Sequence, residues 1–146
     1  MGQVFFFSYK EEENALTGLK RLFEKSASAA MIPGGEPVAI KLHMGELGNI
    51  RHIRPVFVRK VVDIIRGEGG KPFLIDTVAN YPGGRESKEK SLDTAARNGF
   101  VEASVNAPVV IADDTDDLQT IPIRNPVDGC ELKEIKVSSL MLRPSF

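Results

Sequence analysis

The chain has 146 residues, of which 42% are hydrophobic and 27% are charged, and these fractions are typical of a soluble globular protein. Lys and Arg (19) nearly balance Asp and Glu (20), so no strong positive field draws the protein to nucleic acid. No apolar run approaches the length of a signal-peptide core or a membrane span. These features predict a single domain over residues 1–146 that is cytoplasmic and has neither a nucleic-acid nor a membrane partner.

The first third of the chain predicts a strand, a helix and a loop. Residues 4–9 (VFFFSY) are aromatic and apolar, which is typical of a buried strand. Residues 11–13 are glutamates that suit the first turn of a helix, and apolar residues then recur at helical spacing as far as Phe23. A loop rich in Ser, Ala and Gly ends this helix before residue 38.

The middle of the chain predicts a βαβ unit. Residues 38–42 (VAIKL) and 72–77 (PFLIDT) are the two strands, and the segment between them has an apolar helical face that begins at Pro55. The glycines of residues 67–70 end the helix. Such a unit places its strands in parallel with a right-handed crossover.

The remainder of the chain predicts a further helix, a strand and a hairpin. The helix covers residues 87–98, and a strand follows at residues 109–112. Leu92, Ala95 and Ala96 are expected to face the core, and Gly99 to terminate the helix. Residues 121–124 and 131–140 alternate in polarity around a turn at residues 128–129, which predicts an antiparallel hairpin appended to the sheet. The predicted fold is therefore α/β: a three-layer α/β/α sandwich with a mainly parallel sheet and a C-terminal antiparallel hairpin.

Polar residues cluster where the two strands of the βαβ unit end. Ligands of open parallel sheets bind outside the carboxyl ends of the strands, so these two clusters are expected to share one crevice. The residues after the first strand are His43, Gly45, Glu46, Gly48 and Asn49, and those at the end of the second are Asp76, Thr77, Asn80, Tyr81, Gly83, Gly84 and Arg85.

The composition of these clusters favours an acidic small molecule as ligand. Gly45 and Gly48 permit tight turns that let main-chain amides approach an anion. The helix beginning at Pro55 directs its positive dipole end toward the same region. Arg51, Arg54 or Arg85 are candidates to bind a carboxylate or phosphate.

Two other chemistries remain open for the same crevice. His43, Glu46 and Asp76 offer nitrogen and oxygen ligands for a divalent metal, and equally a base and an acid for proton transfer. In the enzymatic alternative His43 is the general base and Arg85 anchors an acidic substrate. The simpler alternative is that His43 is a hydrogen-bonded turn residue. His52 adds a second imidazole whose direction the sequence does not fix.

Several familiar site types are not predicted. Cys130 is the only cysteine, so an internal disulfide is excluded, and this chain alone cannot ligate an iron–sulfur cluster. The acidic residues 113–117 lack the pattern of an EF-hand and are expected to form a solvated turn. The glycine-rich segments lack the lysine and hydroxyl of a P-loop, and no GxGxxG motif follows a strand.

The segments VAIKLHMGELGN, IRP, GGKPFLIDT and NYPGGR resemble the family called domain of unknown function 362. The resemblance covers residues 36–115 and continues more weakly to Lys136. Many members of that family continue into a lysine-histidine element and a ferredoxin-like segment with two iron–sulfur clusters. The resemblance implies that this chain is either a short member or the N-terminal part of a longer protein, in an iron–sulfur-linked redox context with an iron–sulfur protein as partner.

The sequence leaves three functional hypotheses. The first is a domain that binds an acidic small molecule, a metal or a metallocofactor of unknown identity in the crevice. The second is the enzyme that uses His43 as general base. The third is a structural or interaction module that needs a homodimer partner or a further C-terminal half to cover its apolar surface.

Overall fold

The computed structural model describes residues 3–8, 14–26, 28–32, 34–112, 117–124, 128–129 and 131–142. The elements in chain order are α1 (Ala15–Lys25), η1 (Ser28–Met31), β1 (Pro37–Lys41), α2 (Pro55–Gly67), β2 (Lys71–Asp76), α3 (Lys88–Arg97), α4 (Glu102–Val105), β3 (Val109–Ile111), β4 (Leu118–Pro122), β5 (Glu134–Ser138) and η2 (Ser139–Leu142). The predicted α/β class is confirmed, with a parallel three-stranded sheet and an antiparallel hairpin.

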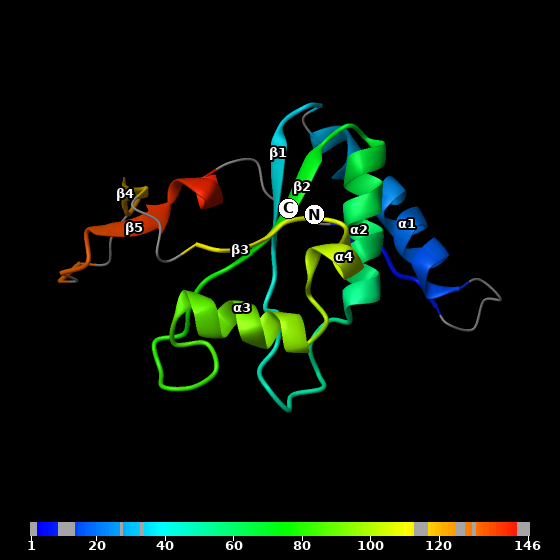
Figure 1. The fold of residues 1–146 in the computed structure, drawn as a ribbon. Coiled ribbons are helices and arrows are strands. Elements are labelled where there is room, and N and C mark those ends of the chain that lie inside the picture. The colour runs from blue at the N-terminus through cyan, green and yellow to red at the C-terminus, as the bar shows by residue number, and fades with distance from the viewer. Residues whose placement is uncertain are drawn as a thin grey trace.

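The βαβ unit is the centre of the fold. β1 pairs with β2 in parallel, with Val38 opposite Pro72 and Lys41 opposite Ile75, and β2 pairs with β3 in the same sense. α2 begins with Pro55 at its first turn, where the missing N–H costs nothing because that amide has no helical partner. Figure 1 shows the β1–α2 loop and the β2–α3 loop at the same end of the sheet, beside α3.

One face of the sheet carries the main core. Side chains of β1, β2 and β3 that alternate along the strands pack there against α2, the end of α3 and the segment that follows it. The fully buried members with the largest side chains are Phe100, Ile65, Leu74, Ile111, Val38, Val62 and Val105. α1 lies outside α2 on this side of the molecule (Figure 1).

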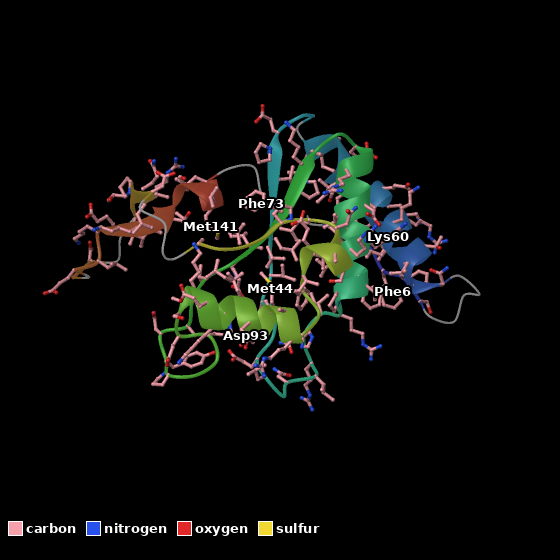
Figure 2. The ribbon with its side chains drawn as sticks, in the orientation of Figure 1. Phe6, Met44, Lys60, Phe73, Asp93 and Met141 are labelled. Carbon is pink, nitrogen blue, oxygen red and sulfur yellow. The ribbon has the colours of Figure 1, made fainter. Side chains whose placement is uncertain are left out.

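The other face of the sheet is covered by the hairpin region. Ala39, Ile75 and Ala112 form a small buried cluster against Phe73 and two residues of η2, Leu140 and Met141. Phe73 and Met141 lie on this side in Figure 2. The covering layer is thus a single 3-10 turn, η2, that directly follows β5, whereas α2 and α3 occupy the first face.

Two predictions about edges of the fold are wrong. Among the described residues, β4 and β5 form a separate two-stranded sheet and are not hydrogen-bonded to the main sheet. Residues 3–8 form no strand within the described part of the predicted segment 4–9. The Phe7 ring instead packs on α1, against the Gly18 backbone and beneath Arg21, so its side-chain contacts are with a helix face.

Helix ends mostly follow the predicted signals. Asn14 caps α1 by accepting the amides of Leu16 and Thr17, and the predicted first-turn glutamates 11–13 lie outside the described residues. Ser87 caps α3, and Gly99 follows that helix with φ +87°. Ala96 was predicted to face inward but is exposed. Residues 113–116 and Cys130 also lie outside the described part.

The contact between Phe7 and α1 predicts an unusual response to Gly18→Ala. Alanine ordinarily stabilises a helix interior by about 1 kcal/mol relative to glycine. A Cβ on Gly18 would lie 2.5 Å from the Phe7 ring, so the gain is offset by displacement of that ring. We expect Gly18→Ala to leave the free energy of unfolding nearly unchanged, and the same substitution to stabilise by about 1 kcal/mol in a Phe7→Ala background. Equal effects in both backgrounds, measured by urea denaturation, would contradict this packing.

Candidate functional site

Arg85 is the centre of a charged cluster at the end of β1 and β2. Its side chain is 9% exposed. One guanidinium nitrogen donates to Glu46 at 3.0 Å and faces His43 Nε2 at 2.7 Å, and the other donates to Asp76 at 3.0 Å and to the Thr77 carbonyl at 3.2 Å. The crevice predicted from the sequence therefore does bring side chains of both loops together.

Asp76 is the most buried carboxylate of this cluster. Its side chain is 4% exposed and accepts from Arg85 through Oδ2 and from Lys41 Nζ through Oδ1, at 2.8 Å. Because an unpaired buried charge is costly, two cationic partners account for its burial at the last position of β2. Lys41 reaches it from the adjacent strand β1.

Glu46 links the two loops at the rim of the cluster. It accepts a hydrogen bond of 2.5 Å from the Tyr81 hydroxyl and one of 3.0 Å from Arg85. The Tyr81 bond is the largest cause of a Glu46 pKa below its usual value; burial opposes it, and the contact with Arg85 adds to the lowering. The hydrogen bond between Tyr81 and Glu46 also raises the pKa of Tyr81, since it favours the protonated phenol.

This contact predicts the titration of Glu46. A carboxylate with a lowered folded-state pKa contributes stability that is complete above its unfolded pKa and is lost as pH falls through the folded value. Tyr81→Phe removes the largest cause, so we expect the pKa of Glu46 to rise toward its ordinary value of 4.5. Side-chain carboxyl NMR of both proteins over an acid titration measures this directly. An unchanged Glu46 pKa in Tyr81→Phe would show that the hydroxyl contact does not act on the carboxylate.

His43 faces hydrogen-bond donors on both ring nitrogens. The Gly45 amide points at Nδ1 at 2.9 Å, and Arg85 points at Nε2. Neutral imidazole has one acceptor nitrogen and guanidinium cannot accept, so only one of these two contacts is a hydrogen bond in either tautomer. With the proton on Nε2, the ring accepts from Gly45 but its N–H faces the Arg85 donor, whereas with the proton on Nδ1 the Nε2 atom accepts from Arg85. The tautomer of His43 is thus coupled to the Arg85 cluster.

The guanidinium of Arg85 lies where the sequence hypothesis placed a metal ion. His43, Glu46 and Asp76 all face this group. Among the residues that the structure describes, no three side chains of His, Cys, Asp or Glu are grouped as metal ligands. Arg85 therefore neutralises the two carboxylates, and its donors contact groups of the protein itself.

A surface groove adjoins this cluster on the β1–α2 loop. It has a volume of about 460 Å³ and is lined by Lys41, Leu42, His43, Asn49, Arg51, His52 and Ile53. None of these seven side chains is a carboxylate, and we call this surface the cationic groove. Arg51 is exposed and has no ion-pair partner among the described residues.

The loop that forms the cationic groove is held by local contacts. His52 Nδ1 lies 2.8 Å from the Asn49 carbonyl, which requires the proton on Nδ1 and leaves Nε2 as an acceptor. The His52 ring also contacts Phe100, with 5.8 Å between ring centroids. Gly45 turns with φ +88° close beneath His52 and Asn98, whose side-chain amide donates to the Met44 carbonyl.

The other predicted site residues have varied positions. Gly48 turns with φ +80°, and Asn49 accepts the Arg51 amide. The Gly84 carbonyl accepts from Thr94, a polar contact that explains why α3 buries Thr94 rather than Ala96. Asn80 is exposed on the β2–α3 loop, and Arg54 is the N-cap residue of α2 without a side-chain cap bond.

Lys41 and His52 were not among the predicted site residues. The alternation of β1 could have identified Lys41, because the last strand residue lies on the opposite face from Ile40 and beside the end of β2. His52 carries no such signal, since its direction depends on a loop that the hydrophobic pattern does not fix.

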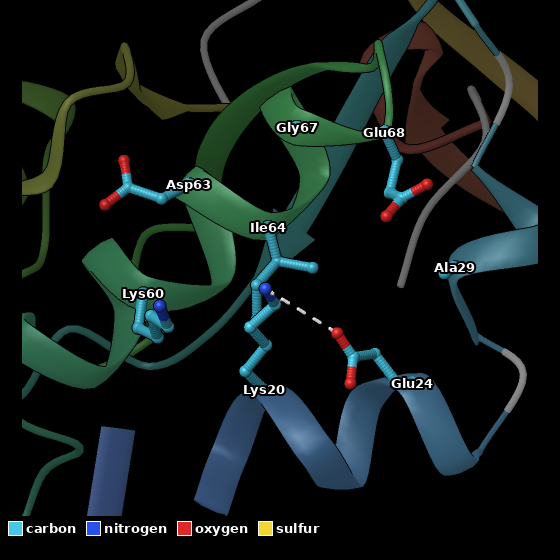
Figure 3. A pocket seen from close by; sticks show the side chains of 8 residues that line it. All are labelled: Lys20, Glu24, Ala29, Lys60, Asp63, Ile64, Gly67 and Glu68. Carbon is cyan, nitrogen blue, oxygen red and sulfur yellow. Dashed lines mark ion pairs between the residues drawn. The ribbon is translucent and has the colours of Figure 1, made fainter. Parts of the chain in front are cut away.

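A second hollow between α1 and α2 makes a useful contrast (Figure 3). It has a volume of about 290 Å³ and mixes both charges: Lys20, Glu24, Lys60, Asp63 and Glu68 line it with Ala29, Ile64 and Gly67. Lys20 pairs with Glu24 at 3.7 Å. Its three acids outnumber its two bases, so it offers no preference for an anion.

The fold and the charged cluster define an α/β domain with polar chemistry gathered at the carboxyl ends of two parallel strands. Residues 38–144 match the family described as Domain of unknown function (DUF362), and the chain belongs to this family. The match extends past the region of clearest resemblance and includes the hairpin. No curated protein and no solved structure matches the chain. Among the described residues, no helix has the length and apolar character needed to cross a membrane.

Proposed function

We propose that this domain binds a small anion, a carboxylate or a phosphate, in the cationic groove. The observation that carries the proposal is the lining itself: Lys41, His43, Arg51 and His52 are brought together at the end of β1, with no carboxylate among the lining side chains. An anion near these groups gains charge-assisted hydrogen bonds. Binding at the carboxyl end of a parallel strand also follows the general behaviour of open α/β sheets.

The charged and polar side chains of the groove differ in whether another residue already binds them. Lys41 is committed to Asp76, whereas Arg51 has no ion-pair partner among the described residues. His43 is half-exposed, at 52%, and is positioned by the Arg85 cluster behind it. Arg51 therefore supplies the principal charge and the principal hydrogen-bond donor for the anion.

Anion binding also agrees with the position of α2. This helix begins two residues after Ile53, and its N-cap residue Arg54 has no side-chain bond to the first-turn amides. A helix N-terminus favours nearby negative charge. The predictions that His43 binds a metal or acts as a general base stay predictions, as do the single-domain organisation and the iron–sulfur partner.

Calorimetric titration with inorganic phosphate and with acetate tests the proposal. We expect Arg51→Ala to weaken the affinity for both anions roughly 5- to 10-fold, the loss of one charge-assisted bond at an exposed site. Arg66→Ala is the matched control, because Arg66 lies in the last turn of α2, at the end opposite to the groove. Affinity that is absent, or that falls equally in both variants, would overturn a specific anion site.

A further inference from the structure

An apolar hollow continues from the cationic groove along β1. It has a volume of about 240 Å³ and is lined by Leu19, Ile40, Lys41, Leu42, Ile53, Phe57, Val58 and Val61. Lys41, Leu42 and Ile53 line both cavities, so the two are neighbours that share a wall. We call this second cavity the apolar trough.

Further apolar surface lies beyond the trough. A third hollow is lined by Phe5, Phe6, Phe7, Ala15, Leu19, Leu22 and Phe57, and it shares Leu19 and Phe57 with the trough. Phe6 is 84% exposed at this end of the molecule, where Figure 2 labels it beside the helices. Apolar surface therefore extends in one direction away from the cationic groove.

The cationic groove is charged and the trough beside it is apolar, so a boundary between the two kinds of surface lies where they meet. Lys41 lines both cavities, and its ammonium is held by Asp76. Ile53 stands at the same boundary and is 59% exposed, which is costly for an isoleucine beside an apolar hollow unless something covers it. A ligand that spans both cavities needs one charged end and one apolar end.

We infer that the anion of the proposed function is the head of an amphipathic organic acid, whose unbranched apolar chain lies in the trough. This inference rests on the proposed function, because the cationic groove supplies the head site. Only the cationic groove offers a charge to the ligand, because the trough is apolar. The acidic head of the ligand must therefore lie in the groove and its chain in the trough. Its carboxylate or phosphate lies near Arg51, and its chain passes Ile53 toward Leu19 and Phe57.

A series of straight-chain carboxylates tests the inference. Acetate, butyrate, hexanoate and octanoate are titrated at one ionic strength, each well below its micelle concentration. We expect affinity to rise ~2-fold for each added CH₂, or about 16-fold from butyrate to octanoate, which corresponds to roughly half of the transfer free energy of full burial. Octyltrimethylammonium, with a similar chain and a cationic head, is expected to bind at least roughly 10-fold more weakly than octanoate.

Two variants locate the chain. Leu19→Ser changes the lining of the trough but not that of the cationic groove, and it is expected to remove most of the gain with chain length while leaving phosphate affinity unchanged. Leu132→Ser makes the same change at an exposed leucine outside these cavities and is expected to keep the gain. Comparing the two variants shows whether the gain in affinity comes from the trough or from any exposed apolar side chain.

Four results would overturn the inference. If phosphate binds but chain length has no effect, the trough is not part of the site and the proposed function stands. If no anion binds, the proposed function is wrong, and the inference that rests on it is wrong as well. Equal binding of octyltrimethylammonium would show that the head site does not select charge. A dimer in sedimentation that Leu19→Ser dissociates would show that a second copy of the chain covers the trough.

Discussion

Asp76→Ala is expected to lower the free energy of unfolding by about 3–5 kcal/mol, the usual cost of leaving a buried charge without its partner. Asp76 accepts from both Arg85 and Lys41 and is only 3% exposed. Its loss leaves the Arg85 guanidinium, itself buried, with Glu46 and a carbonyl as its acceptors. Chemical denaturation of the two proteins at neutral pH measures the difference.

Asp63→Ala provides the control for this result. Asp63 also accepts from an arginine, Arg59 at 2.9 Å, but both side chains are at least 40% exposed on α2. Its loss is expected to cost only about 0.5 kcal/mol. The double variant Asp76→Leu with Arg85→Met should be more stable than either single variant, because it removes both charges together. Equal losses for Asp76→Ala and Asp63→Ala would contradict the description of a buried charged cluster.

Gly45→Ala is expected to destabilise the protein by about 2–3 kcal/mol and to disturb the cationic groove. The φ of +88° costs an alanine about 1–2 kcal/mol. A Cβ would also lie 2.7 Å from Asn98 Nδ2 and 2.8 Å from His52 Nδ1. Both atoms are held by hydrogen bonds, to Met44 and Asn49, and moving them sacrifices roughly 1 kcal/mol of bonding.

Gly48→Ala separates the cost of backbone strain at positive φ from the cost of a steric clash between the new Cβ and its neighbours. Gly48 has a similar φ of +80°, but a Cβ there meets open space. We expect it to cost only the backbone term of about 1–2 kcal/mol and to leave His52 in place. The measurement is thermal or urea unfolding together with the NMR shifts of the His52 ring. Matching stability losses and matching ring shifts in the two variants would mean that the close approach beneath Gly45 has no influence on the groove.

The periodic part of the fold was predictable from sequence. The βαβ unit followed from two apolar runs that flank an amphipathic helix with Pro55 at its start, and all three elements form within one residue of the predicted positions. The segment 4–9 has the composition of a strand, yet the described residues 3–8 pair with none. Composition cannot distinguish an aromatic run that enters a sheet from one that lies on a helix face, because the strand preference of aromatic residues reflects how their side chains pack and not the backbone conformation alone.

The site was predictable in location and less so in the role of each residue. His43, Glu46, Asp76 and Arg85 do meet, because parallel strands end at the same edge of the sheet. That Arg85 is directed inward depends on its burial, which sequence spacing does not reveal. The grouping of Arg51 and His52 in one groove depends on the turns at Gly45 and Gly48, which have no periodic pattern.

Amide NMR during titration with acetate and inorganic phosphate is the most direct test of the central claim that the cationic groove binds anions. The account predicts saturable shifts concentrated at residues 41–53 and at the His43 and His52 rings, with little change around Lys20 and Lys60 in the hollow of mixed charge between α1 and α2. Shifts that do not saturate, or that are strongest in that second hollow, would contradict it.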